Sequence, residues 1–138
     1  MSEIFRSDSV AMTEEYGRQL AQTLTAGDVV AFYGGMGVGK TAMVRGIADG
    51  LGLSAEVSSP TFALVHNYGG QPPLIHFDMY RVTGWDDLYS TGYFDYLDAG
   101  AILVVEWSEN VEAALPEGAI RIRIQQAEEN VRLIERVG

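Results

Sequence analysis

Two continuous apolar runs stand out in the pattern of hydrophobic and polar residues. They cover residues 29–33 (VVAFY) and 101–105 (AILVV). Runs of this length, bounded by glycine or polar residues, are typical of strands buried on both faces of a sheet. The pattern therefore predicts two fully buried strands, far apart in the sequence.

Apolar residues at helical spacing predict two helices, one on each side of the first strand. A helix over about 14–25 would bury Tyr16, Leu20 and Leu24, with Thr13 as its cap. A helix over about 40–51 would bury a stripe that ends at Leu51, and Gly52 is a natural stop.

The rest of the chain alternates between short strands and short helices. Residues 62–79 predict a hairpin with its loop at 69–73, and residues 85–98 predict short helical pieces. Ser108 is the expected cap of a short helix that ends near 115–116, and strands are expected at 120–124 and 131–137. The expected fold is α/β: a single domain over 1–138, with a mixed central sheet, flanking helices and hairpins.

Composition narrows the class of protein. The chain has 138 residues, 47% hydrophobic, which suits one globular domain. No apolar run reaches the roughly 18 residues of a membrane span. Cysteine is absent, and the N-terminus MSEIFRSDSV lacks the features of a secretory signal. We therefore expect a cytoplasmic protein with no membrane contact.

The charge is strongly acidic, with a formal net charge of −10. A protein that binds nucleic acid alone needs cations to replace the counterions around phosphates, so this chain is a poor candidate for that role. Among nine basic residues only one is lysine, Lys40, which directs attention to its neighbourhood.

The glycine-rich segment after the first buried strand matches a phosphate-binding motif. Residues 34–41 read GGMGVGKT and satisfy G-x-x-x-x-G-K-[ST] between a predicted strand and a predicted helix. Glycines let successive N–H groups point at phosphate oxygens, and the helix N-terminus adds its positive end. The α/β domain is therefore expected to be P-loop NTPase-like. The expected nucleotide-binding residues are Gly34, Gly35, Met36, Gly37, Val38, Gly39, Lys40 and Thr41, with the Thr41 hydroxyl on Mg²⁺.

Two acidic residues follow apolar strands and are candidates for the metal side of such a site. Asp78 ends the run 74–77, and Glu106 ends the run 101–105. Ligands of open α/β sheets bind at the carboxyl ends of strands, and Mg²⁺ prefers carboxylates. His76 could be a ligand or a base, but a lone histidine in a strand favours a packed structural role.

The residues leave three function classes open: a partner-dependent ATPase, a small-molecule kinase and a nucleotide-binding regulator with negligible hydrolysis. A GTPase of the Ras type is excluded, because its N-K-x-D motif needs a second lysine. A kinase usually surrounds both phosphate groups with cations, and here Arg81 is the sole basic residue between Arg45 and Arg121. The kinase is therefore the alternative rather than the first interpretation.

Further segments resemble the TsaE family (also called YjeE), the small ATPases of bacterial tRNA threonylcarbamoyladenosine synthesis. Besides the P-loop, the similar segments are Ser59–Phe62 (SPTF), His76–Arg81 (HFDMYR) and Val105–Trp107 (VEW), within residues 10 to 115. The P-loop alone would be unspecific, whereas these three in this order are highly specific. The chain departs from the family at Gly35 and Met36, where Asp and Leu are usual.

The resemblance implies roles for individual residues. Glu106 would bind the metal, and Asp78 would be the catalytically important aspartate near the metal and the attacking water. Thr61 would sense the γ-phosphate within a switch segment at 59–62. Trp107 would lie beside the nucleotide, although core filling is an alternative, and Thr13 would approach the nucleotide unless it only caps a helix.

The resemblance also implies partners. Members of the family act with TsaB and TsaD, the latter transferring the threonylcarbamoyl group to tRNA, and ATP hydrolysis resets that complex. Contact with tRNA would then be indirect, in keeping with the acidic charge. The stretch 85–98 combines five aromatic residues with four aspartates and no basic residue, which suits a basic partner surface. Packing of these rings on the sheet is the alternative.

Overall fold

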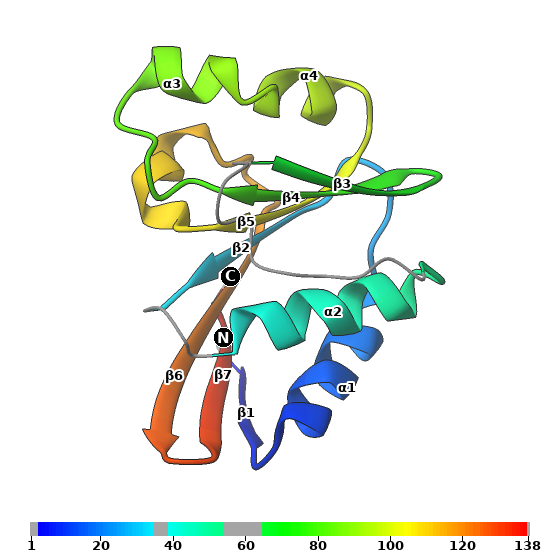
Figure 1. Ribbon diagram of the computed structural model, residues 1–138, viewed down its shortest axis with the longest axis vertical. Helices are drawn as coiled ribbons and strands as arrows, with labels where there is room; N and C mark the ends of the chain where they lie inside the picture. The colour runs from blue at the N-terminus through cyan, green and yellow to red at the C-terminus, as the bar shows by residue number, and fades with distance from the viewer. Residues whose placement is uncertain (1–2, 35–38, 54–64, 138) are drawn as a thin grey trace.

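The computed structural model describes residues 3–34, 39–53 and 65–137 (Figure 1). The strands are β1 (Glu3–Ser7), β2 (Val29–Tyr33), β3 (Val65–Gly70), β4 (Pro73–Asp78), β5 (Ile102–Glu106), β6 (Ile120–Glu128) and β7 (Val131–Val137). They form one sheet in the order β1-β7-β6-β2-β5-β4-β3. Neighbours β6, β2, β5 and β4 are parallel, whereas β1–β7, β6–β7 and β3–β4 are antiparallel. The predicted mixed sheet is confirmed.

Helices cover both faces of this sheet. They are α1 (Val10–Ala21), α2 (Lys40–Gly50), α3 (Trp85–Ser90), α4 (Tyr93–Asp98) and the 3-10 helix η1 (Ser108–Ala114). Figure 1 shows α1 and α2 side by side below the sheet and α3 and α4 above it. Within the described residues, no helix has the length and apolar character needed to cross a membrane.

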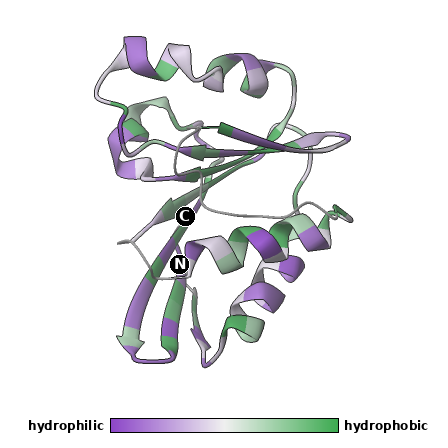
Figure 2. Cartoon of the chain, in the orientation of Figure 1, coloured by the Kyte–Doolittle hydropathy of each residue, from purple (hydrophilic) through white to green (hydrophobic). Residues whose placement is uncertain are grey.

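Successive side chains of the central strands pack alternately into two separate hydrophobic cores, one on each face of the sheet. On β2, Val30 and Phe32 pack in the core under α1 and α2, whereas Val29 packs in the core with α3, α4 and η1. Every residue of β5 is buried, as its continuous apolar run predicts. Figure 2 shows hydrophobic residues gathered on the central strands, with hydrophilic and hydrophobic residues alternating along β6 and β7.

The start of the first helix was predicted wrongly. Ser9, not Thr13, is the N-cap, and its hydroxyl accepts a hydrogen bond from the Met12 N–H at 3.1 Å. The helix therefore begins four residues earlier and ends at Ala21. Val10 and Met12 in its first turn are exposed, so the apolar periodicity that marks a helix begins only after the true start.

A second predicted cap is also wrong. Ser108 does begin a short helix, but the N-cap is Trp107, and the Ser108 hydroxyl donates to the Val105 carbonyl at 2.9 Å. Ser108 is fully buried, so its hydroxyl bonds back into the end of β5 rather than to the helix N–H groups.

The two terminal segments pair with each other, and the N-terminal strand was not foreseen. β7 lies between β6 and β1, and Phe5 of β1 pairs with Ile134 of β7. The predicted C-terminal hairpin is confirmed, and β6 joins β2 in parallel. The hairpin therefore extends the sheet directly beside the strand that leads into the P-loop.

Candidate phosphate-binding site

The glycine-rich segment begins and ends in backbone conformations that favour glycine. Gly34, just after β2, has φ +133°, and Gly39, just before α2, has φ +99°. Because the N-cap residue Gly39 has no side chain, no side-chain cap takes up the first amides of α2. Uncapped amides at a helix N-terminus are a site for anions. The predicted loop residues Gly35, Met36, Gly37 and Val38 lie outside the described residues.

Lys40 is the first residue of α2, and only 5% of its surface is exposed. Its ammonium group donates to the Gly34 carbonyl at 3.1 Å, which closes the two ends of the loop on each other. The Nζ atom also lies 3.9 Å from Glu106 Oε1 and 5.2 Å from the centre of the Trp107 ring. A buried cation between a carboxylate and an aromatic face is held in one place.

The two predicted acidic residues come together at the carboxyl ends of neighbouring parallel strands. Asp78 of β4 pairs in register with Glu106 of β5. They differ in environment: Glu106 is 5% exposed, whereas Asp78 is half-buried and its Oδ1 accepts from the Tyr80 N–H at 2.9 Å. One carboxylate is therefore fixed inside the site, and the other lies at its edge.

Glu106 has a second buried partner on the neighbouring strand. His76 of β4 is fully buried, and its Nε2 lies 2.5 Å from Glu106 Oε2. The expectation of a packed histidine is right about its burial. A purely structural role, however, leaves out its direct hydrogen bond to the candidate metal ligand.

Trp107 directly follows Glu106 and turns the chain sharply. Its φ is +59°, and it is the one residue other than glycine with positive φ among those described. Non-glycine residues adopt this conformation rarely, and mostly where the surroundings enforce it. Its ring packs on Tyr80 with ring centres 4.8 Å apart, and its face lies beside the Lys40 ammonium. Trp107 therefore forms part of the wall of the site.

The donor set of this edge fits Mg²⁺. Glu106 and Asp78 offer carboxylate oxygens at this edge, and Thr41, the second residue of α2, offers a hydroxyl. Mg²⁺ prefers such oxygens together with water and phosphate oxygens. In the described part of the chain no three His, Cys, Asp or Glu side chains form a self-sufficient metal cage.

A cavity of about 300 Å³ adjoins the N-terminus of α2. Thr13, Gly39 and Arg132 are among its lining residues. The buried Thr13 hydroxyl shares a hydrogen bond with Ser7 Oγ at 2.7 Å, so this hydroxyl is already engaged. Thr13 therefore contributes surface to the cavity rather than an open hydroxyl.

Sequence reasoning missed two parts of this region. Arg132 lies on β7, in a hairpin that carries no recognisable motif, and only the pairing of β7 beside β6 brings it to the cavity. The polar residues of β3 that contact His76 were also missed, because their alignment depends on the register of the β3–β4 hairpin. The predicted switch segment with Thr61 lies outside the described residues.

The comparisons with known proteins agree on one family. A family model described as "Threonylcarbamoyl adenosine biosynthesis protein TsaE" matches residues 7–134. A Streptomyces coelicolor protein named tRNA threonylcarbamoyladenosine biosynthesis protein TsaE is 42% identical over 116 residues, which cover 82% of this chain and 78% of that protein. The Treponema pallidum protein of the same name is 35% identical over 119 residues, covering 86% and 88%. The crystal structure of Bacillus subtilis YdiB superposes with a TM-score of 0.81 at 29% identity, covering 99% of this chain and 84% of that one.

Proposed function

Because the chain belongs to the TsaE family of threonylcarbamoyl adenosine biosynthesis proteins, we propose that it is a Mg²⁺-dependent ATPase that serves tRNA threonylcarbamoyladenosine modification. The observation that carries the ATPase proposal is Lys40. Its buried ammonium lies at the start of α2, bonded to Gly34 and facing Glu106. This arrangement supports binding of the β- and γ-phosphates of ATP at that point.

The residues around Lys40 would divide the work of binding and hydrolysis. The Thr41 hydroxyl and the Glu106 carboxylate would hold Mg²⁺, with Asp78 beside them. The metal ion, when bound with ATP, neutralises charge on the phosphate oxygens. Asp78 is half-buried at the edge of the site, a place from which a carboxylate can orient a water molecule toward the γ-phosphate. Thr61 would complete the site by sensing that phosphate.

The cavity beside the helix N-terminus supports a place for the adenosine end of the nucleotide. Its lining includes Gly39, which adjoins the proposed phosphate site, together with Thr13 and Arg132. A planar guanidinium can stack on an aromatic base. Trp107 would lie near the phosphates, close to Lys40.

The proposed partners are the TsaB and TsaD proteins, with tRNA contacted only through their complex. The net charge of −10 supports this division, because this chain offers little to attract a nucleic acid. ATP hydrolysis would reset the partner complex between turnovers. The absence of cysteine is in keeping with the reducing cytoplasm, where we place this activity.

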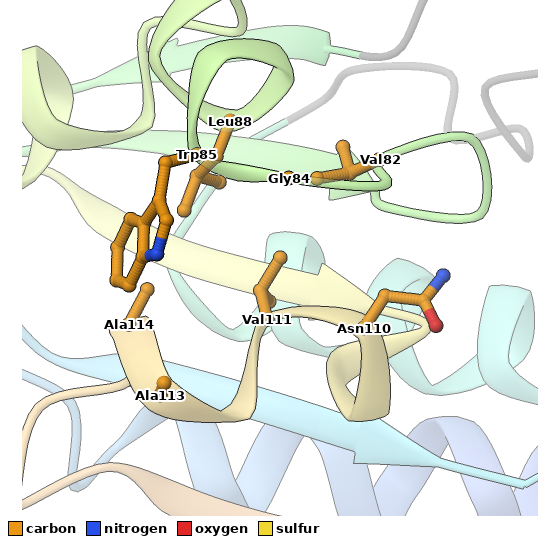
Figure 3. Close-up of a pocket in the computed structure, with 8 residues that line it drawn as sticks. All are labelled: Val82, Gly84, Trp85, Leu88, Asn110, Val111, Ala113 and Ala114. Carbon is orange, nitrogen blue, oxygen red and sulfur yellow. The ribbon is translucent and has the colours of Figure 1, made fainter.

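A surface formed by α3, α4 and η1 is the proposed contact with those partners. Trp85 and Tyr89 are large and well exposed, and Phe94 packs against both rings. Figure 3 shows the Trp85 ring beside Ala114, at the rim of a cavity of about 140 Å³ between α3 and η1. From residue 82 to residue 120 the chain contains no basic residue. Exposed aromatic rings with acidic surroundings favour a partner with apolar and basic groups.

The first experiment measures phosphate release from ATP by the protein alone and with TsaB and TsaD added. Stimulation by the partners is expected. Turnover only with a small-molecule phosphoryl acceptor would replace the proposal by the kinase alternative. Tight ATP binding with no turnover under any condition would indicate a regulator.

The second experiment tests the phosphate site with Lys40→Ala and with ligand-induced stabilisation. Loss of the only lysine is expected to abolish hydrolysis and weaken ATP binding. ATP with Mg²⁺ at about 100 times its dissociation constant should stabilise the wild-type fold by about 2.7 kcal/mol. Wild-type turnover in the variant would contradict the assignment of the P-loop.

The third experiment separates the two acidic residues by titrating Mg²⁺ against activity and binding. Glu106→Ala is expected mainly to raise the Mg²⁺ requirement, as loss of a metal ligand does. Asp78→Ala is expected mainly to lower turnover while ATP still binds. If both variants show the same ligand-type defect, the proposed division between them is wrong.

A further inference from the structure

A chain of polar side chains crosses three neighbouring strands and ends on Glu106. It starts at His66 and Tyr68 on β3, passes through His76 on β4 and reaches Glu106 on β5. The distances are 3.3 Å from His66 Nδ1 to the Tyr68 hydroxyl, 3.1 Å from that hydroxyl to His76 Nδ1, and 2.5 Å from His76 Nε2 to Glu106 Oε2. His76 and Glu106 are both buried, so water does not compete for these contacts.

The direction of these hydrogen bonds follows from the last acceptor. An ionised carboxylate only accepts, so the His76 Nε2–H donates to Glu106. In the neutral ring Nδ1 then carries no hydrogen and accepts from the Tyr68 hydroxyl. The Tyr68 oxygen can in turn accept from the Nδ1–H of His66. One consistent set of donors and acceptors therefore runs from β3 to Glu106.

The two oxygens of Glu106 consequently have different neighbours. Oε2 is taken by His76, and Oε1 faces the Lys40 ammonium at 3.9 Å. With Oε2 held, the carboxylate cannot turn freely about its last bond. Oε1 is therefore presented to the site in one orientation.

We propose that His76, oriented by Tyr68, is a positioning residue that fixes the Glu106 carboxylate for Mg²⁺-dependent ATP binding. This inference rests on the proposed ATP site, since Glu106 is its metal ligand. His76 itself touches neither metal nor nucleotide in this scheme. Hydrogen-bond partners of metal ligands typically matter by about 10–100-fold in metal affinity or activity.

Two substitutions of similar polarity separate positioning from packing. In His76→Gln the amide nitrogen can occupy the place of Nε2 and still donate to Glu106. In His76→Asn the shorter amide reaches only the place of Nδ1, so the donor to Glu106 is lost. The readout is the Mg²⁺ concentration that half-saturates binding of a fluorescent ATP analogue, with binding in excess EDTA as the metal-free reference.

We expect His76→Asn to raise the half-saturating Mg²⁺ concentration by about 10–100-fold, without changing binding in EDTA. His76→Gln should recover most of that loss, and Tyr68→Phe should show a smaller defect than His76→Asn. An unchanged Mg²⁺ requirement in a folded His76→Asn variant would overturn the proposal. Equal defects in the Gln and Asn variants would also overturn it, because packing alone would then explain the effect.

A second measurement needs no nucleotide and so separates this inference from the proposed function. Imidazole ¹⁵N chemical shifts of the wild-type protein report which nitrogen of His76 carries the proton. The expected result is protonated Nε2 and bare Nδ1, with the Nε2 signal perturbed by Glu106→Gln. A ring protonated on Nδ1 alone would overturn the positioning role even if ATP binds. The expected tautomer in a protein that binds no ATP would overturn only the proposed function.

Discussion

The two faces of the sheet are covered in different ways. On one face α1 and α2 approach so closely that glycines are needed between them: a Cβ added at Gly17 would lie 2.5 Å from the Met43 carbonyl oxygen, and one at Gly46 would overlap that of Glu14. On the other face α3 and α4 have six residues each, and the α3 side chains Trp85 and Tyr89 are exposed to solvent.

The difference follows the tasks that we propose for the two faces. Helix α2 carries Lys40 at its first position, so a rigid contact with α1 fixes the ammonium relative to β2 and β5. Helices α3 and α4 carry no residue of the phosphate site, and they expose rings and carboxylates for contact with another protein. Substitutions on the two faces should therefore differ in what they damage.

The largest effect on stability is expected from Gly46→Ala. The added methyl group must push α1 away from α2, and overpacking of this kind typically costs about 1–3 kcal/mol, or more where backbone has to move. The better helix propensity of alanine offsets roughly 1 kcal/mol of that cost. Urea unfolding should still show a clear loss of stability, together with weaker ATP binding because Lys40 moves with α2.

Gly84→Ala is the matched control on the other face. Gly84 precedes α3 with extended backbone, and no atom lies within 4 Å of an added Cβ. Gly84 is also the N-cap of α3, where glycine is preferred over alanine, so a loss of no more than about 1 kcal/mol is expected. We call the face covered by α1 and α2 the tight face and the face covered by α3 and α4 the loose face. Equal losses of stability in the two variants would contradict this contrast.

A middle-sized effect is expected from Tyr93→Phe in the second core. Tyr93 is fully buried, and its hydroxyl donates to the Ala114 carbonyl at 3.0 Å, which ties α4 to the end of η1. Losing a single hydrogen bond of this kind costs about 1 kcal/mol. ATP binding should be unchanged, because the lost hydrogen bond joins α4 to η1 and involves none of the proposed phosphate-binding residues. A loss of ATP affinity equal to that of Gly46→Ala would show that the two faces are coupled.

High pH should lower the stability of the folded protein through two tyrosines that contact η1, Tyr93 and Tyr33. Burial raises the pKa of Tyr93 to about 12, and burial with the hydrogen bond to Glu112 of η1 raises the pKa of Tyr33 to about 12. A pKa raised by folding stabilises the folded state fully below the unfolded value, near 10, and this contribution is lost as pH rises through 12. Thermal unfolding should therefore show a falling midpoint between about pH 10 and 12. The fall should be smaller in Tyr93→Phe, and an equal fall would contradict the role of this phenol.

Much of the tight face could be predicted from the sequence, because its signals are local. The run 29–33, the P-loop pattern and the stripe of α2 each lie within a dozen residues. Strand β2 and helix α2 appear where expected, whereas residues 35–38 between them lie outside the described residues. The start of α1 was missed because Ser9 and Thr13 are both good caps and the first turn is exposed. β1 was missed because it pairs with β7, at the far end of the chain.

In the candidate site, too, features with local sequence signals could be predicted, and features that depend on the pairing of strands could not. Asp78 and Glu106 could be placed together because both follow apolar strands whose ends meet at one edge of the sheet. The contacts of His76 with Tyr68 and Glu106 could not, since they depend on the β3–β4 register, which includes an irregularity between Asn67 and Gly70. Arg132 was missed because only the order of strands brings the C-terminal hairpin to Gly39.

The smallest effect on stability, and the sharpest test of the loose face, is expected from Asp86→Lys. Asp86 is exposed in the first turn of α3. Its neighbour Asp87 accepts hydrogen bonds from the Thr83 N–H and hydroxyl, and these bonds hold the pKa of Asp87 below its usual value. Asp86 is therefore the residue whose charge can be reversed without disturbing this local structure. Its stability should fall by no more than about 1 kcal/mol, because a cation replaces an anion in the first turn of α3, and ATP binding should stay normal.

Association of Asp86→Lys with the proposed partners TsaB and TsaD should weaken, and its dependence on salt should decrease, because charge pairs steer association and salt screens them. Glu117→Lys, in the exposed turn before β6, makes the same change of charge outside α3 and α4 and serves as the control. Association should be measured from low ionic strength to about 0.15 M, where the screening length is roughly 8 Å. If both variants associate like wild type at low salt, the acidic side of α3 is not part of the contact. If both weaken equally, net charge rather than this surface attracts the partner.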